Sequence, residues 1–239
     1  METLADLEVS RAFPARCISY EHDSGPLELR PTLASDAEQV AACVRKSQRE
    51  LRAFMPWAHD EVALSPKSQL ERLRETEADY FAGRDLVMGL FREGTMLSMV
   101  GLHPRVPLNP SGLEVGYWAP TPFAKQGFTT LAVQIIVTYA FDKLGANRLQ
   151  VSCDRENAGS RRVIEKVGFA HEAVLRAIIA DGTPELVAGG YRASGYSLLF
   201  ALFPDTFAAL PWVSSVRERM RYVNLAGYPL RVRPAVVGS

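Results

Sequence analysis

The sequence is poor in the residues that bind metals or form disulfides. Its three cysteines, Cys17, Cys43 and Cys153, are odd in number and far apart, which favours a reduced, cytoplasmic protein. The four histidines show no metal-ligand spacing, so we predict that no metal is bound. These scarcities argue against a disulfide-stapled secreted scaffold and against a structural zinc domain.

An excess of charge of one sign and a long apolar run are also missing. Lysine plus arginine and aspartate plus glutamate both total 27, so the net charge is zero and no global basic excess points to nucleic acid. No apolar stretch reaches about 18 residues without polar breaks, so we expect no membrane span. The N-terminus carries early acids and no apolar core, which argues against a signal peptide.

What is present is the composition of a globular protein, with 47% hydrophobic and 23% charged residues. Hydrophobic patterns predict a mixed α/β domain over residues 27–203, between an N-terminal extension (1–26) and an arginine-rich, basic C-terminal extension (204–239). Strands are expected at 27–30, 85–92, 96–103, 114–119, 148–153, 169–179 and 195–203. Helices are expected at 35–51, from residue 65 onward, at 129–145 and at 157–167.

Helix boundaries have local signals. The segment Ser35-Asp-Ala-Glu38 is typical of a capping box, and Pro66 suits the first position of the second helix. Gly168 is a typical stop for the helix before it. The helix at 129–145 is apolar almost all round, so we expect it to be buried.

The most informative stretch is 114–130, which predicts a strand, a tight turn and a helix start. The turn ends at Gly127, and the backbone N–H groups at the start of the following helix are suited to an anion such as a phosphate. Lys125 adds a positive charge there. No Gly-Lys-Ser/Thr follows, so the turn is not a P-loop. Taken alone, Gly127 is also explained by an ordinary turn without a ligand, because glycine often serves backbone geometry.

A second polar pair stands at the start of a later helix. Asn157 is a good N-cap and Ser160 fits the first helical turn, so both have a purely structural explanation. Basic residues slightly outnumber acidic ones between residues 124 and 176, a bias that suits a cofactor with several phosphates. The turn and this pair together suggest a cofactor with phosphates and a polar arm.

These pieces, in this order, resemble the GNAT superfamily of N-acetyltransferases, in its ribosomal-protein N-acetyltransferase-like (RimJ/RimL-type) branch. The matching segments are Phe54-Met-Pro-Trp57, Glu114-Val-Gly-Tyr-Trp118, Gln126-Gly-Phe-Thr-Thr130, Asn157-Ala-Gly-Ser160 and Gly168-Phe169. The resemblance covers roughly residues 27–203. It implies an α/β (α+β) fold with a mixed, mostly antiparallel central sheet, flanking helices, and fourth and fifth strands that splay apart.

The resemblance implies an enzyme that moves an acetyl group from acetyl-CoA to a primary amine by direct attack in a ternary complex. The acceptor is a protein N-terminus or a small molecule, and acceptor specificity is expected near residues 54–59 and 181–196. The pantetheine arm is expected at Trp118 and Ala119, where a backbone N–H can stabilise the oxyanion. Asn157 is expected to bond the arm, and Ser160 to lie near the sulfur. The pyrophosphate is expected on the turn, at Lys125, Gln126, Gly127, Phe128, Thr129 and Thr130.

Proton transfer needs a base and an acid. An α-amine has a pKa of about 7.7–8.0, so part of it is neutral at pH 7 and the base need not be strong. We expect Glu114 as the base, with Glu172 second. Ser160 is expected to protonate the leaving thiolate, with Tyr191 and Tyr196 as rivals. The alternative for either carboxylate is an exposed surface group.

Several alternatives stay open. Ala124 and Thr129 depart from the family's turn pattern, which motivates a GNAT-like module that binds CoA or a protein partner without catalysis. An antibiotic or metabolite as the acceptor is another alternative. Tyr117 and Trp118 are explained equally well by core packing. A covalent route through Cys153 has no neighbouring histidine in its favour. A homodimer is left open.

Overall fold

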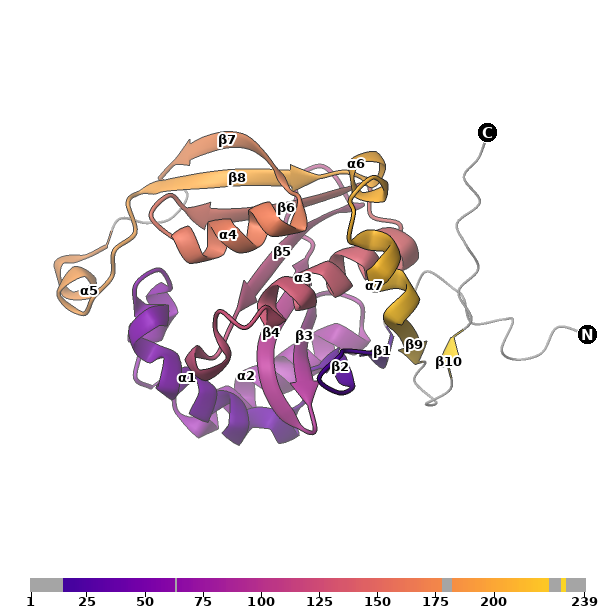
Figure 1. Cartoon of the computed structure of the whole chain (residues 1–239). Coiled ribbons are helices and arrows are strands. Elements are labelled where there is room, and N and C mark those ends of the chain that lie inside the picture. Colours follow the sequence, from indigo (N-terminus) through magenta and orange to yellow (C-terminus); the bar gives the residue numbers. More distant parts are fainter. Residues whose placement is uncertain (1–14, 63, 178–181, 224–228, 231–239) are drawn as a thin grey trace, which may run out of the picture.

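The computed structural model describes residues 15–62, 64–177, 182–223 and 229–230 (Figure 1). The described strands form a single ten-stranded sheet in the order β10-β9-β1-β2-β3-β4-β5-β6-β8-β7. The strands are β1 (Cys17–Tyr20), β2 (Leu27–Pro31), β3 (Leu86–Arg92), β4 (Thr95–His103), β5 (Gly112–Trp118), β6 (Arg148–Asp154), β7 (Ala170–Arg176), β8 (Tyr196–Leu202), β9 (Met220–Val223) and β10 (Pro229–Leu230). Neighbouring strands run antiparallel except β5 and β6, which are parallel. The mixed, mostly antiparallel sheet is therefore confirmed.

Helices cover both faces of this sheet (Figure 1). The α-helices are α1 (Ala37–Arg52), α2 (Pro66–Phe81), α3 (Phe128–Tyr139), α4 (Ala158–Val167), α5 (Pro184–Ala188), α6 (Pro204–Ala208) and α7 (Val213–Arg219). The short turns are η1 (Ala34–Asp36), η2 (Pro56–His59), η3 (Thr121–Phe123) and the π-turn η4 (Ala140–Leu144). Helices α1 and α2 pack on one face, while α3, α4 and α7 pack on the other. Among the described residues, no helix combines the length and apolar character needed to cross a membrane.

Most helix ends follow the sequence signals. The Ser65 side chain accepts a hydrogen bond from the Ser68 N–H (3.2 Å) and Pro66 is the first residue of α2. Gly168, with φ of 101°, ends α4 as expected. The predicted helix at 129–145 is shorter, because α3 gives way to the π-turn, which Gly145 ends with φ of 66°.

The capping box predicted at 35–38 is wrong. The chain forms η1 before α1 begins at Ala37, so Ser35 lies inside that turn and is not the N-cap. The Asp36 carboxylate instead accepts the Leu33 N–H (2.8 Å) and pairs with Arg30 (2.8 Å). Burial alone would raise the pKa of Asp36, but the bonds from Arg30 and Leu33 outweigh it and lower that pKa.

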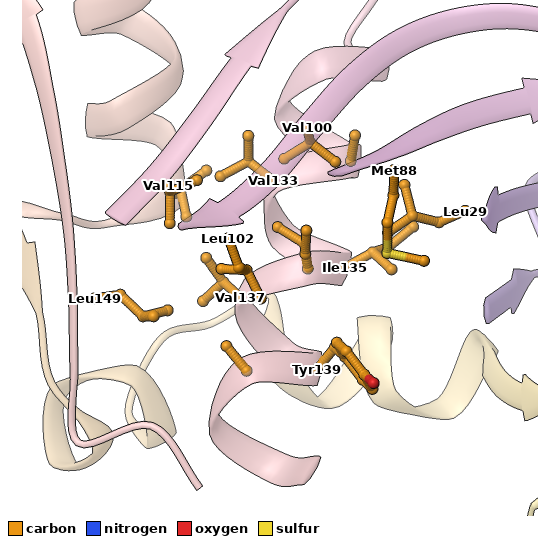
Figure 2. Packing of buried hydrophobic residues seen from close by; sticks show 14 of the residues in the cluster. Leu29, Met88, Val100, Leu102, Val115, Val133, Ile135, Val137, Tyr139 and Leu149 are labelled. Carbon is orange, nitrogen blue, oxygen red and sulfur yellow. The ribbon is translucent and has the colours of Figure 1, made fainter. Parts of the chain in front are cut away.

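The larger core lies between the sheet and α3. Figure 2 shows Val133, Ile135 and Val137 of α3 packed near Val100 of β4 and Val115 of β5, and all five are buried. This confirms the buried helix expected from its apolar pattern. Burial of branched side chains contributes roughly 1.5–3 kcal/mol each, which anchors α3 and therefore the turn before it.

The sheet continues past both predicted domain boundaries. Ile18 of β1 is in register with Leu29 of β2 on one side and with Tyr222 of β9 on the other. Tyr139 of α3 accepts a hydrogen bond from the Ala15 N–H (2.9 Å). Strands from the segments 1–26 and 204–239 therefore lie side by side in the same sheet as the central domain.

Candidate functional site

The strands β5 and β6 separate after a short parallel contact. Pairing covers only Gly112–Glu114 against Arg148–Gln150. From Val115 onward β5 pairs with β4 alone, while β6 continues against β8. Among the described strands, none occupies the β6-facing edge of β5 from Val115 to Trp118. The expected splay is thus confirmed, and this edge can bond an extended ligand as another strand would.

The peptide groups of β5 are directed alternately toward β4 and toward this opening. The Trp118 carbonyl accepts a hydrogen bond from the Ser98 hydroxyl of β4 (3.2 Å), so it is directed away from β6. Because successive residues of a strand direct their peptide groups to opposite sides, those of Tyr117 and Ala119 are directed toward the opening. The Trp118 indole donates to the Met99 sulfur (3.2 Å) and packs on the α1–α2 face.

The helix α3 begins at the wide end of the opening. Its N-cap, Gly127, has φ of 91° and provides no side-chain cap. The first N–H groups of a helix have no partner within the helix, so they and the helix dipole favour an anion at this position. A Cβ added to Gly127 would meet no atom within 4 Å, so the space beside it is open. Lys125, with φ of 62°, is exposed next to it.

The side chains of the turn mostly hold the turn itself. Thr129 accepts a hydrogen bond from the Ser98 hydroxyl (3.3 Å), and Phe128 is buried beneath the Arg92 guanidinium (5.0 Å). The Gln126 amide donates to a carbonyl within the turn (2.9 Å). Of the residues predicted to bind the pyrophosphate, these three therefore have backbone groups, rather than side chains, available to a ligand.

The start of α4 closes the other side of the opening. The Asn157 side chain accepts the Ser160 N–H (3.0 Å), so its predicted capping role is confirmed. The Ser160 hydroxyl lies 2.9 Å from the Tyr117 hydroxyl, which also donates to the Ser160 carbonyl (3.0 Å). A strand residue and a helix residue therefore meet across the opening. Sequence reasoning found Ser160 but missed this partner, because a tyrosine on a strand is explained by packing alone.

Burial determines the direction of the pKa shifts of the two ionisable side chains beside Ser160, which are Tyr117 and Cys153. Burial raises the pKa of the Tyr117 hydroxyl, and the hydrogen bond with Ser160 opposes the shift only in part. Burial also raises the pKa of the Cys153 thiol, again opposed by Ser160. A thiol that is harder to ionise is a poorer nucleophile, so the cluster does not favour a covalent route through Cys153.

The two predicted bases lie in different surroundings. Glu114 is half-buried at the narrow end of the opening, where its Oε2 accepts from the Gln150 amide (3.3 Å) and its Oε1 lies 3.9 Å from Arg105. Glu172 lies on the edge strand β7 in a two-pronged pair with Arg148 (3.0 and 2.6 Å). The hydrogen bonds from Arg148 lower the pKa of Glu172, which makes that carboxylate a weaker base.

A histidine that the sequence analysis passed over lies beside Glu114. His103 is in register with Glu114 on the neighbouring strand, and its Nδ1 is 2.6 Å from the Asp85 carboxylate. The ring leans over Gly101 and Gly116, because a Cβ at either glycine would lie within 2.9 Å of its Nε2. The sequence shows the histidine and the two glycines, but their meeting depends on strand register, and a search for metal spacing does not detect it.

The two segments expected to set acceptor specificity meet at the end of α1. The Arg192 N–H donates to the Ala53 carbonyl (2.8 Å), and the rings of His59 and Tyr191 pack edge to face (6.1 Å). Trp57 is 41% exposed next to them. The first residue of the second segment, Asp181, lies outside the described residues.

The two rival acids differ in position. Tyr191 is buried, whereas the half-buried Tyr196 ring lies between the guanidinium groups of Arg155 (4.7 Å) and Arg176 (5.8 Å). Within the described ranges, no group of three or more His, Cys, Asp or Glu side chains is placed to hold a metal ion.

Comparison with known proteins agrees with this geometry. Residues 26–170 match the family described as Acetyltransferase (GNAT) domain. The putative ribosomal N-acetyltransferase YdaF of Bacillus subtilis (strain 168) is 30% identical over 165 residues, which are 67% of this chain and 84% of YdaF.

Two solved structures are similar in fold. Mycobacterium smegmatis RimJ in complex with CoA-disulfide superposes with a TM-score of 0.68 at 20% identity, covering 86% of this chain and 95% of RimJ. The ribosomal-protein-S5-alanine acetyltransferase from Vibrio fischeri gives a TM-score of 0.66 at 16% identity, covering 78% of this chain and 97% of that enzyme. At these identities the likeness concerns the fold.

Proposed function

The chain belongs to the GNAT acetyltransferase family and is an acetyl-CoA-dependent N-acetyltransferase, and from this premise we propose that it acetylates the α-amine of a protein N-terminus. The observation that carries the choice of acceptor is the likeness to YdaF, a putative ribosomal N-acetyltransferase, along most of both chains. The fold likeness to an enzyme named for acetylating the alanine of ribosomal protein S5 supports the same choice. A small-molecule acceptor is the alternative that the test below separates.

The cofactor would follow the opening from its wide end inward. The pyrophosphate would lie at the start of α3, where Gly127 leaves the first N–H groups uncapped and Lys125 adds a charge. The pantetheine arm would bond the free edge of β5 through the peptide groups of Tyr117 and Ala119. The amide nitrogen of Asn157 is suited to the same arm, because only its oxygen is used by the helix cap. This assignment relies on backbone groups more than on side chains.

The reaction would be a direct attack. The amine nitrogen adds to the thioester carbonyl carbon, an N–C bond forms, and the C–S bond breaks as the tetrahedral intermediate collapses. A β5 N–H directed into the opening, from Tyr117 or Ala119, would stabilise the oxyanion. No covalent bond to the enzyme is needed, which agrees with a Cys153 thiol whose pKa is raised.

The leaving thiolate needs a proton. The Ser160 hydroxyl would supply it and would regain a proton from Tyr117, 2.9 Å away, and Tyr117 would then take one from water. Because the pKa of Tyr117 is raised, its hydroxyl keeps its proton at neutral pH and remains available as a donor. Glu114 is the carboxylate expected as the base, at the narrow end of the same opening.

A panel of acceptors tests the function. Peptides that begin with alanine or serine would be incubated with acetyl-CoA, and product would be followed by CoA release and by mass spectrometry. We expect acetylation at the α-amine, and none on matched peptides whose N-terminus is already blocked. Turnover of an aminoglycoside or a polyamine without turnover of any peptide would overturn the protein acceptor.

A further inference from the structure

We propose that His103, oriented by Asp85, takes the proton from the attacking amine. The inference rests on the proposed function insofar as the acceptor is an amine. It replaces Glu114 as the base and assigns that carboxylate a supporting part.

Four polar residues form a row across the sheet on the α1–α2 face. Because Val87 is in register with Gly101, Asp85 stands opposite His103 on the next strand. His103 is in register with Glu114, and Glu114 with Gln150 of β6. Side chains in register on neighbouring strands lie on the same face and within reach of one another. The row therefore links the start of β3 to the narrow end of the opening.

The carboxylate fixes which ring nitrogen is basic. An ionised carboxylate only accepts hydrogen bonds, so the 2.6 Å contact with Asp85 places a proton on Nδ1 of His103. In the neutral ring, Nε2 then carries the lone pair. Among the described residues, none hydrogen-bonds Nε2, and the side chain is 15% exposed. A histidine oriented in this way is suited to act as a general base.

Two glycines place Nε2 at the opening. A Cβ on Gly101 would lie 2.8 Å from Nε2, and a Cβ on Gly116 would lie 2.9 Å from it. Any larger residue would push the ring off the sheet. Gly116 lies beyond Glu114, the last β5 residue paired with β6, so Nε2 lies over the strand where the opening begins.

The base and the acid lie on opposite faces of the sheet. His103 and Gly116 are on the face of α1 and α2, where the described parts of the predicted acceptor segments 54–59 and 181–196 also meet. Tyr117 packs with the α3–α4 core and bonds Ser160. An amine that arrives from the α1–α2 face would lose its proton there, while the thiolate would be protonated on the other face.

The chemistry favours the imidazole over the carboxylate. An unperturbed imidazole has a pKa of about 6.5 and a carboxylate about 4.3, so a proton from an amine at about 7.7–8.0 moves to an imidazole at less cost than to a carboxylate. Among the described residues, the charged groups around the ring are Asp85, Glu114 and, beyond Glu114, Arg105. The nitrogen thus gives one proton to Nε2, the thiolate takes one from Ser160, and His103 returns its proton to water.

The test compares His103→Gln with His171→Gln, a matched change at an exposed histidine on β7. With an alanine-initiated peptide, we expect His103→Gln to lower kcat by about 10²–10³-fold and to remove the acid limb of its pH profile, while His171→Gln changes neither. Calorimetry should show an unchanged Kd for acetyl-CoA in both. A His103→Gln enzyme that keeps the wild-type acid limb would overturn the proposal.

Asp85→Asn tests the orientation of the ring. Loss of the carboxylate should release the orientation and tautomer of the ring, seen as a fall in kcat at an unchanged Kd for acetyl-CoA and as changed NMR signals of the His103 ring nitrogens. Gly116→Ala displaces the ring without altering its chemistry, and should reduce kcat more than it raises the peptide KM. Thermal unfolding checks that each variant folds, and an unchanged kcat with unchanged ring-nitrogen signals in Asp85→Asn would count against the positioning role.

The proposed function can fail separately. If wild-type enzyme binds acetyl-CoA but acetylates no peptide, the protein acceptor is wrong. The proton role is then measured on the slow hydrolysis of acetyl-CoA, in which water replaces the amine and also needs a base. His103→Gln should lower that hydrolysis and His171→Gln should not, and equal rates would overturn the inference.

Discussion

At the residue scale, the behaviour of the site depends on a few side chains whose surroundings differ. The Tyr117 hydroxyl is kept protonated by burial, whereas the Glu172 carboxylate is kept ionised by Arg148. The first can therefore donate a proton at neutral pH and the second cannot accept one easily. Position in the fold, more than residue type, therefore separates Tyr117, the proposed proton donor, from Glu172, which is held in an ion pair.

The Tyr117–Ser160 pair should act as a unit. We expect Ser160→Ala and Tyr117→Phe each to lower kcat about 10²-fold, and the double variant to be little worse than either, because both changes interrupt one proton path. Single-turnover rates with a saturating peptide measure this. A Ser160→Ala enzyme with undiminished turnover would rule the path out, and losses that add fully would show two independent roles.

Asp36 should make stability depend on pH. Its pKa is lowered on folding, so its contribution is present above its usual pKa and is lost as the pH falls through the folded value. Asp36→Asn should cost about 1–3 kcal/mol of unfolding free energy at pH 7, as for other hydrogen bonds to charged groups. Urea titrations at pH 7 and pH 3 should show this difference shrinking in acid. A constant difference would contradict the assignment.

At the element scale, the site depends on where α3 begins. Its apolar face is buried against β4 and β5 (Figure 2), which holds the uncapped N-terminus at the wide end of the opening. The start itself requires Gly127 in a left-handed conformation. Backbone geometry, held by core packing, therefore forms the proposed phosphate site without a ligand.

Gly127→Ala should weaken cofactor binding. The left-handed conformation costs an alanine roughly 1–2 kcal/mol, so the turn is expected to relax and the N–H groups to move, raising the Kd for acetyl-CoA about tenfold. Gly25→Ala is the matched control, since Gly25 has φ of 108° and open space around it, in the turn between β1 and β2. Calorimetry should show an unchanged Kd for Gly25→Ala. Equal affinities for both variants would mean that this turn does not hold the cofactor.

At the scale of the whole molecule, residues distant in sequence complete one sheet. The strand β9 pairs with β1, and Arg217 of α7 pairs with Asp142 of the π-turn after α3 (2.6 Å). The hydrogen bonds that Arg217 donates to the Asp142 carboxylate raise the pKa of Arg217. The C-terminal segment therefore supports α3, at whose start the phosphate site is proposed (Figure 1).

Removing a buried ring from β9 should destabilise the whole domain. Tyr222 is buried with its ring 5.8 Å from that of Tyr139, so Tyr222→Ala should cost about 3–5 kcal/mol and lower Tm. Exposed Arg221 on the same strand provides the control, and Arg221→Ala should change unfolding free energy by less than about 0.5 kcal/mol. A normal Tm for Tyr222→Ala would show that the C-terminal segment unfolds independently.

The sequence by itself determined the parts that depend on near neighbours in the chain. Pro66 after Ser65, Gly168 after α4 and the apolar run of α3 are local signals, and the structure confirms each. The prediction of a capping box at 35–38 was wrong because Asp36 is bonded to Arg30 and to the Leu33 N–H. The pattern of residues at a helix start does not predict these two bonds.

Tertiary structure decided which residues of different elements meet. The contact of Tyr117 with Ser160 joins a strand to a helix, the contact of Asp85 with His103 crosses the β3–β4 pair, and β1 pairs with β9 from the far end of the chain. The alternation of apolar and polar residues along a strand predicts which face of the sheet each side chain lies on, but not which strand lies beside it. The candidate cofactor turn was therefore visible in the sequence, as were Glu114 and Ser160, whereas the partners proposed for proton transfer, Tyr117 beside Ser160 and Asp85 beside His103, emerge only in the folded chain.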